Sequence, residues 1–206
     1  MLFNCKKLSP LTKPQREKAT VDKAVLALTG MPGSGKSLVV NIAREKGYEI
    51  IIMGDIIREE TRKRGLTLTP ENTGQTMLEL RQKEGPATIA KRCLPKIAAT
   101  TNPKILIDGI RSLDEVAEFQ NHFPKFTLIA LHASPKTRFS RLLKRARPDD
   151  PKKWQAFHER DIRELTVGLG NAIAMAENMI INEGTPETTK QEVRQTLEKV
   201  EQKWKK

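Results

Sequence analysis

Residues 24–37 read AVLALTGMPGSGKS, in which an apolar run directly precedes the pattern G-x-x-x-x-G-K-S. The run 24–29 predicts a buried strand, and the amphipathic sequence after Ser37 predicts a helix that ends near Gly47. A strand, a glycine-rich turn and a helix in this order form a phosphate-binding loop. A chain of this length shows the bare pattern by chance about once in a hundred, and the flanking elements make chance rarer. The stretch therefore predicts a nucleotide site in an α/β fold.

The residue types of this loop suit a bound phosphate. Glycines allow a tight turn and leave the backbone N–H groups open, while the following helix points its positive end at the same place. Lys36 can reach the β- and γ-phosphates, and the Ser37 hydroxyl can ligate Mg2+. We expect the nucleotide to bind Gly30, Met31, Pro32, Gly33, Ser34, Gly35, Lys36, Ser37 and Leu38.

Strands and helices alternate along the rest of the chain, which predicts a parallel sheet with helices on both faces. We expect one domain over residues 23–206 and a basic, flexible tail over residues 1–22. The helices expected within residues 54–99 exceed what a simple crossover needs, and such an insertion commonly holds a second substrate. The five expected strands cover residues 24–29, 48–52, 104–109, 126–131 and 178–182.

Two acids follow expected strands. Residues 104–109, KILIDG, have the form of a buried parallel strand whose terminal carboxylate, Asp108, points at the site. In phosphate-loop proteins such an acid helps to hold Mg2+, so Ser37 and Asp108 are the predicted metal ligands. Asp55 follows the second strand, where it caps a helix or takes part in the site. Ser112 and Glu115 form a capping box and are explained by structure.

The sequence 135–165 predicts two helices joined by a polar loop. In the first, Phe139, Leu142, Leu143 and Ala146 recur on the buried side, which leaves Arg138 on a solvated face. In the second, the apolar set is Trp154, Phe157, Ile162 and Leu165.

Arginines mark the loop between these helices and the second helix itself. Arg145 and Arg147 stand at the start of residues 145–153, a short segment that could close over phosphates as a lid. Further along, Arg160 and Arg163 either pair with Asp161 and Glu164 or bind phosphate, and the sequence leaves both alternatives open.

Composition narrows the class of protein. The chain has 206 residues, of which 37% are hydrophobic and only 4% aromatic, so its core is aliphatic. No signal peptide or membrane-length apolar run is present, and we expect a cytoplasmic protein without a membrane partner. Cys5 and Cys93 fit neither a metal-ligand spacing nor a disulfide framework.

The formal net charge of +12 is concentrated in the tail and in residues 136–153, which carry eight Lys or Arg and two Asp. A basic protein attracts polyanions, which include nucleotides, coenzymes and RNA. Charge alone does not choose among them.

The order of these motifs resembles that of the adenylate kinase and nucleoside monophosphate kinase superfamily. More closely, the stretches MGDIIREE, IDGIRSLDEV, RPDDP and ERDIREL are similar to an archaeal family of adenylate-kinase-related proteins, and the resemblance covers about residues 24–182. The phosphate loop and the entry to the second strand also resemble dephospho-coenzyme A kinase. Glu115 departs from the glutamine by which adenylate kinases read adenine, which leaves the acceptor open.

The resemblance implies a P-loop NTPase fold of the nucleoside monophosphate kinase type, with ATP and Mg2+ as cofactors. It implies that Asp55, Arg58 and Arg111 hold an acceptor. Transfer of the γ-phosphate then relies on four catalytic residues, Lys36, Asp108, Arg145 and Arg147.

Two hypotheses from different classes follow. The first is a phosphotransferase acting on a nucleotide-like or coenzyme-like acceptor, with a dephospho-coenzyme A kinase-like enzyme as its main variant. The second is a slow nucleotide-binding switch or RNA-associated ATPase, suggested by the basic tail and by the basic stretch 136–153. The chain has no N-K-x-D element of GTPases and no L-S-G-G-Q signature of ABC-type ATPases.

Overall fold

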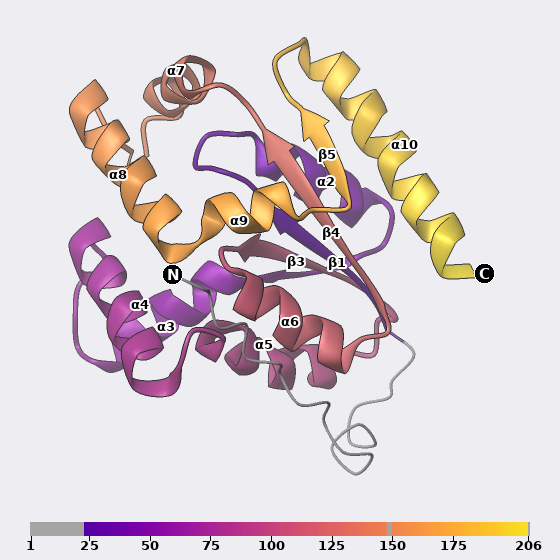
Figure 1. Ribbon diagram of the computed structural model, residues 1–206, viewed down its shortest axis with the longest axis horizontal. Helices are drawn as coiled ribbons and strands as arrows, with labels where there is room; N and C mark the ends of the chain where they lie inside the picture. The colour runs from indigo at the N-terminus through magenta and orange to yellow at the C-terminus, as the bar shows by residue number, and fades with distance from the viewer. Residues whose placement is uncertain (1–22, 148–149, 206) are drawn as a thin grey trace, which may run out of the picture.

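The computed structural model describes residues 23–147 and 150–205. Its centre is a five-stranded, fully parallel sheet with the strand order β2-β3-β1-β4-β5 (Figure 1). The expected α/β fold with helices on both faces is confirmed. The strands are β1 (Ala24–Thr29), β2 (Glu49–Ile52), β3 (Lys104–Ile110), β4 (Lys125–His132) and β5 (Asn178–Ile181).

Each face of the sheet is covered by its own layer of helices. Val25 and Ala27 of β1 pack into the layer that contains α3, α5, α6 and α9, whereas Leu26 and Leu28 pack against α2 and α10. This burial on both sides explains why β1 and β3 are nearly continuous apolar runs. The bounds are α2 (Lys36–Glu45), α3 (Met53–Lys63), α4 (Pro70–Glu84), α5 (Thr88–Ala99), α6 (Leu113–His122), α7 (Pro135–Arg145), α8 (Trp154–Val167), α9 (Leu169–Ala174) and α10 (Pro186–Lys205).

The strand order places a site at the carboxyl end of β1. The chain leaves β1 toward β2 on one side and later crosses to β4 on the other, which makes β1 the switch point where ligands bind in open α/β sheets. The register pairs Leu28 of β1 with Asp108 of β3, and then skips Gly109 to pair Thr29 with Ile110. This bulge sets the Asp108 carboxylate beside the start of the phosphate loop.

Helices α3, α4 and α5 fill the connection from β2 to β3, within the expected insertion at residues 54–99. Figure 1 shows α3, α4, α7 and α8 standing around the carboxyl ends of the strands. Ion pairs link the three helices of the insertion: Arg64 contacts Glu60 and Glu79, and Arg92 contacts Glu60 and Glu84. These ion pairs therefore hold the three helices of the insertion together beside the site.

The expected apolar faces of α7 and α8 are partly wrong. Leu143 is 44% exposed and Ile162 is 49% exposed, whereas Arg138, expected on a solvated face, is only 3% exposed. The physical reason is that an ion pair between Arg138 and Asp161, rather than apolar contact alone, joins the two helices. Trp154 and Leu165 are exposed as well, and among the four residues of the α8 set only Phe157 is buried.

Candidate active site

Three glycines give the phosphate loop its shape. Gly30, Gly33 and Gly35 have φ angles of +148°, +83° and +99°, which L side chains rarely adopt. A Cβ atom on Gly33 would come within 2.8 Å of the Arg138 carbonyl oxygen, and one on Gly35 would collide with the Asn182 side chain. The loop thus needs glycine both for its backbone angles and for the close approach of its neighbours.

Side chains from α7 and from the residue after β5 hold the loop from outside. Asn182 donates from Nδ2 to the Ser34 carbonyl oxygen at 2.8 Å, and Arg138 donates to the Pro32 carbonyl oxygen at 3.2 Å. Arg141 contacts the same Ser34 oxygen at 3.4 Å and the Asn182 Oδ1 atom at 3.2 Å. Sequence reasoning missed Asn182, although a polar residue just after a strand, at the carboxyl edge of the sheet, is a candidate site residue.

Lys36 lies partly buried at the base of the loop. Its Nζ atom donates to the Gly30 carbonyl oxygen at 2.5 Å and to the Met31 carbonyl oxygen at 3.4 Å. Burial lowers the pKa of Lys36, while the negative charge of Asp108 opposes that shift. Ser37, next along the helix, is exposed. The partly buried Lys36 side chain and the exposed Ser37 side chain therefore lie next to each other at the start of α2.

Asp108 carries a buried carboxylate oxygen that lacks a hydrogen bond. The Oδ1 atom has no hydrogen-bond partner among residues 23–147 and 150–205. Burial raises the pKa of Asp108, and the nearby charges of Lys36, Arg111 and Arg58 counteract this shift. The structure thus brings three predicted site residues, Lys36, Arg58 and Arg111, within electrostatic reach of Asp108. An acid that remains unsatisfied beside three cations is a candidate ligand or proton acceptor.

Asp55 and Arg58 form a pair on the first turns of α3. Arg58 donates from Nε to Asp55 Oδ1 at 3.0 Å, and both side chains are nearly half exposed. The expectation that Asp55 caps the helix is wrong, because α3 already starts at Met53 and its N-cap position is Ile52. Exposed pairs of this kind contribute little to stability, so Arg58 can exchange its partner for a ligand.

Arg111 lies between α4 and α8 just after β3. Its Nη1 atom is 3.3 Å from Glu164 Oε2 and 3.9 Å from the Met77 sulfur. Its backbone N–H donates to Glu115 Oε2 at 2.7 Å, and Glu115, fully buried, also pairs with Arg81 at 2.5 Å. The Ser112 cap of α6 is confirmed. Glu115 thus has a structural role that sequence reasoning found only in part.

Asp150 organises the segment after α7. Arg145 donates from Nε to Asp150 Oδ2 at 2.9 Å, and the backbone N–H of Arg147 donates to the same oxygen at 3.0 Å. Arg160 of α8 lies 3.9 Å from Asp150 Oδ1. Residues 148–149 of the expected lid at 145–153, like residues 1–22, lie outside the described residues, so the lid and the tail remain predictions.

The two alternatives for the α8 arginines are both incomplete. Asp161 and Glu164 do form ion pairs, but these join them to Arg138 of α7 and to Arg111 after β3, outside their own helix. Helix α8 therefore contacts two other parts of the site, namely α7 and the segment after β3.

Comparisons with known proteins agree with this geometry. A family model described as an AAA domain matches residues 29–158. The UPF0200 protein of Hyperthermus butylicus is 44% identical over 86% of this chain and 95% of its own length. The UPF0200 protein of Methanocaldococcus jannaschii is 48% identical over 77% of this chain and 81% of its own length. The chain belongs to the UPF0200 family. The resemblance to an archaeal P-loop family is thereby confirmed.

Solved structures resemble this UPF0200 protein in fold. TT1252 from Thermus thermophilus has a TM-score of 0.59 at 14% identity, covering 86% of this chain and 97% of that one. Shikimate kinase from Acinetobacter baumannii in complex with shikimate has a TM-score of 0.53 at 18% identity, covering 85% and 93%. The UPF0200 chain has the fold of the P-loop kinases. Among its described residues, no helix is both long and apolar enough to cross a membrane.

Proposed function

We propose that this UPF0200 protein is a phosphotransferase that moves the γ-phosphate of ATP to a nucleotide-like or coenzyme-like acceptor. One observation carries the proposal. Asp108 has a buried carboxylate oxygen without a hydrogen bond and lies within electrostatic reach of Lys36, Arg58 and Arg111. Arg58 and Arg111 add cations beyond Lys36, which a site for one nucleotide alone does not need, whereas phosphoryl transfer works by positioning two partners and by stabilising charge.

The residues present fit ATP and Mg2+. The glycines give the loop backbone angles that other residues rarely adopt and let its neighbours pack closely against it, and Lys36 lies at its base. Ser37 and Asp108 would hold Mg2+, which when bound neutralises charge on the phosphates. In this interpretation the Lys36 ammonium would bind the γ-phosphate. The free lone pairs of Asp108 would contact the metal or the water molecules around it.

Arginines define the acceptor side of the proposal. Arg58 and Arg111 would bind the acceptor's anionic group, because guanidinium forks match phosphate oxygens, and Asp55 would align Arg58. Arg145 and Arg147 would neutralise the transferring group. Glu115 is fully buried against Arg81 and so is poorly placed to read a base, which favours an acceptor other than AMP.

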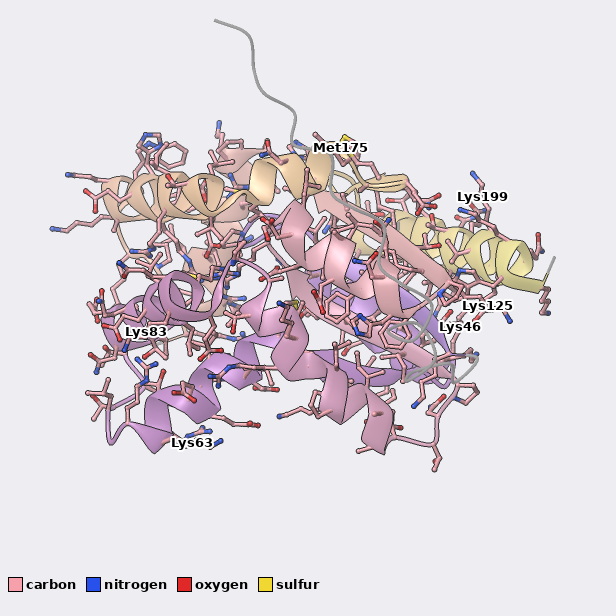
Figure 2. All side chains as sticks on the ribbon, turned by 60° about the horizontal axis from the view of Figure 1, so that its bottom comes forward. Lys46, Lys63, Lys83, Lys125, Met175 and Lys199 are labelled. Carbon is pink, nitrogen blue, oxygen red and sulfur yellow. The ribbon has the colours of Figure 1, made fainter. Side chains whose placement is uncertain are left out.

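Ion pairs weaken the case for RNA as the main ligand. Two arginines of the basic stretch 136–153, Arg138 and Arg145, pair with Asp161 and Asp150. Figure 2 shows Lys63 and Lys83 on one side of the view and Lys46, Lys125 and Lys199 on the other, so these lysines do not form one patch. We therefore place the kinase first and the RNA-associated switch second.

The proposal is tested by product formation from labelled ATP with Mg2+ against a panel of nucleoside monophosphates and dephospho-coenzyme A. Transfer to one acceptor that is lost in Lys36→Ala would establish the kinase and its substrate. Tight ATP binding without transfer to any acceptor would reject the kinase. RNA would then be the next ligand, with salt-dependent binding as the measurement.

Replacing Asp108 with asparagine should remove Mg2+-dependent transfer and raise the melting temperature at neutral pH. Burial raises the folded-state pKa of Asp108 above its unfolded value. The wild type therefore loses stability as the pH rises from the unfolded toward the folded pKa, and the loss is complete above the latter. Asparagine has no charge to bury. Activity should fall about a hundredfold or more, since a metal contributes several kcal/mol to catalysis.

Thermal unfolding of both proteins between acid and neutral pH checks this result. The difference in melting temperature should grow as the pH rises and vanish at the acid end. Wild-type transfer should also weaken as the pH falls, because the carboxylate must be ionised to bind the metal. A variant that is active with Mg2+, or one that is less stable at neutral pH, would contradict the role assigned to Asp108.

A further inference from the structure

Helix α8 is anchored to the phosphate loop through Asp161. This carboxylate accepts two hydrogen bonds from the Arg138 guanidinium, at 2.9 and 2.6 Å, and both side chains are buried. Arg138 in turn donates to the Pro32 carbonyl oxygen at 3.2 Å, and its guanidinium lies 4.9 Å from the centre of the Phe157 ring. A bidentate, buried pair of this kind has a fixed geometry. The position of α8 is therefore tied to the donor side of the site.

One turn further along, the same helix presents Glu164 to the acceptor side. The Glu164 side chain is 9% exposed, and its Oε2 atom lies 3.3 Å from Nη1 of Arg111, which is 37% exposed. This oxygen makes an ionic contact but has no hydrogen-bond partner within the described part of the chain. The negative charge of Glu164 is also felt at Lys36. Glu164 thus contacts an arginine that stays partly exposed.

The two contacts of α8 differ in kind. The Asp161 contact is bidentate and buried on both sides, whereas the Glu164 contact involves one pair of atoms and leaves the guanidinium partly exposed. Arginine has five N–H donors in a planar fork, so a contact at Nη1 leaves other donors available to an anion. The first contact is suited to anchoring the helix and the second to orienting a side chain.

We propose that Glu164 is a positioning residue that orients Arg111 toward the acceptor's anionic group. Through Asp161 and Arg138, helix α8 then holds this arginine at a set place relative to the phosphate loop. The inference rests on the proposed function, because the orientation of Arg111 matters only if an anionic acceptor binds to it. It assigns Glu164 no contact with the reacting atoms.

Simple electrostatics predicts the opposite effect of removing Glu164 on anion binding, which makes the proposal testable. Removing a carboxylate from the neighbourhood of an anion site should tighten anion binding if only charge matters. If Glu164 instead holds Arg111 in the productive orientation, its removal should weaken binding, because the guanidinium must then be ordered by the ligand.

The test measures binding of inorganic phosphate by calorimetry to the full chain saturated with Mg2+ and a non-hydrolysable ATP analogue, which occupies the phosphate loop. Arg111→Ala identifies the Arg111 site, because phosphate binding there should be lost. Glu164→Gln should weaken phosphate binding about five- to tenfold, as expected when the ligand itself must order one rotamer-rich side chain. Glu164→Asp, which keeps the charge and shortens its reach, should weaken it as well. Glu159→Gln makes the same chemical change at an exposed position of α8 and should have no effect.

The outcomes separate this inference from the proposed function. Phosphate binding that requires Arg111 but is unchanged or tighter in Glu164→Gln would overturn the positioning role alone. Absence of any Arg111-dependent phosphate binding in the wild type would overturn the acceptor site, and the positioning role with it. If Glu164→Gln does not fold, as judged by its melting curve, Glu164→Asp gives the same decision.

Discussion

Replacing Lys36 with methionine should abolish phosphoryl transfer and leave the protein at least as stable as the wild type. The Nζ atom contacts only backbone carbonyl oxygens in the structure as described, those of Gly30 and Met31, and burial lowers the pKa of Lys36. Methionine fills a similar volume without a buried charge, so the desolvation penalty disappears. The rate should fall about a thousandfold, the effect of losing one group that stabilises transition-state charge. Such a trade of stability for activity is typical of functional sites.

Lys23 offers a matched control for this prediction. It is buried, at 3% exposure, and like Lys36 it donates to backbone carbonyl oxygens, those of Ile97 and Thr100 at the end of α5. Lys23→Met should therefore lower stability by about 1–2 kcal/mol, because the helix end loses a favourable cation, and should preserve transfer. Melting curves and transfer rates of both variants check the contrast. Equal losses of stability in the two variants would reject a functional reason for burying Lys36.

The features that the sequence predicted are those encoded over short distances. The phosphate loop, its strand and its helix lie within 24–46, and each is specified by neighbouring residues. Asp108 was found because a buried parallel strand that ends in an acid has a known place at the sheet edge. Helix starts at Ser112 and Ser134 were also predictable, since a cap depends on four consecutive residues.

The features that the sequence did not predict depend on partners far along the chain. Arg138 repeats with helical period opposite an apolar stripe, and periodicity cannot distinguish water from the carboxylate of Asp161, which lies 23 residues away. Glu164 has Arg163 as its neighbour in sequence yet contacts Arg111. Asn182 meets Ser34 across 148 residues. Pairing across helices is a tertiary property, so charge spacing alone did not identify these partners.

Replacing Asp161 with asparagine should lower the free energy of unfolding by about 3–5 kcal/mol, because it leaves the Arg138 guanidinium buried without a counter-charge. For a chain of this size the melting temperature should drop by roughly 10 °C. Arg138 is 3% exposed, and water cannot easily replace the lost partner. Glu159→Gln, on the exposed side of the same helix, should change the melting temperature little. A small effect of Asp161→Asn would mean that Arg138 finds other partners.

The double substitution Arg138→Met with Asp161→Leu separates stability from loop geometry. Replacing a buried ion pair by apolar side chains of similar volume is often neutral or stabilising, so the double variant should regain most of the stability that Asp161→Asn loses. It should not regain nucleotide affinity, because the Pro32 carbonyl oxygen no longer receives the Arg138 donor at 3.2 Å and the phosphate loop loses this support. We expect ATP binding to weaken about tenfold, measured by calorimetry beside the melting curves. Recovery of both properties would show that the pair serves packing alone, whereas recovery of stability without affinity would show that it holds the loop for its ligand.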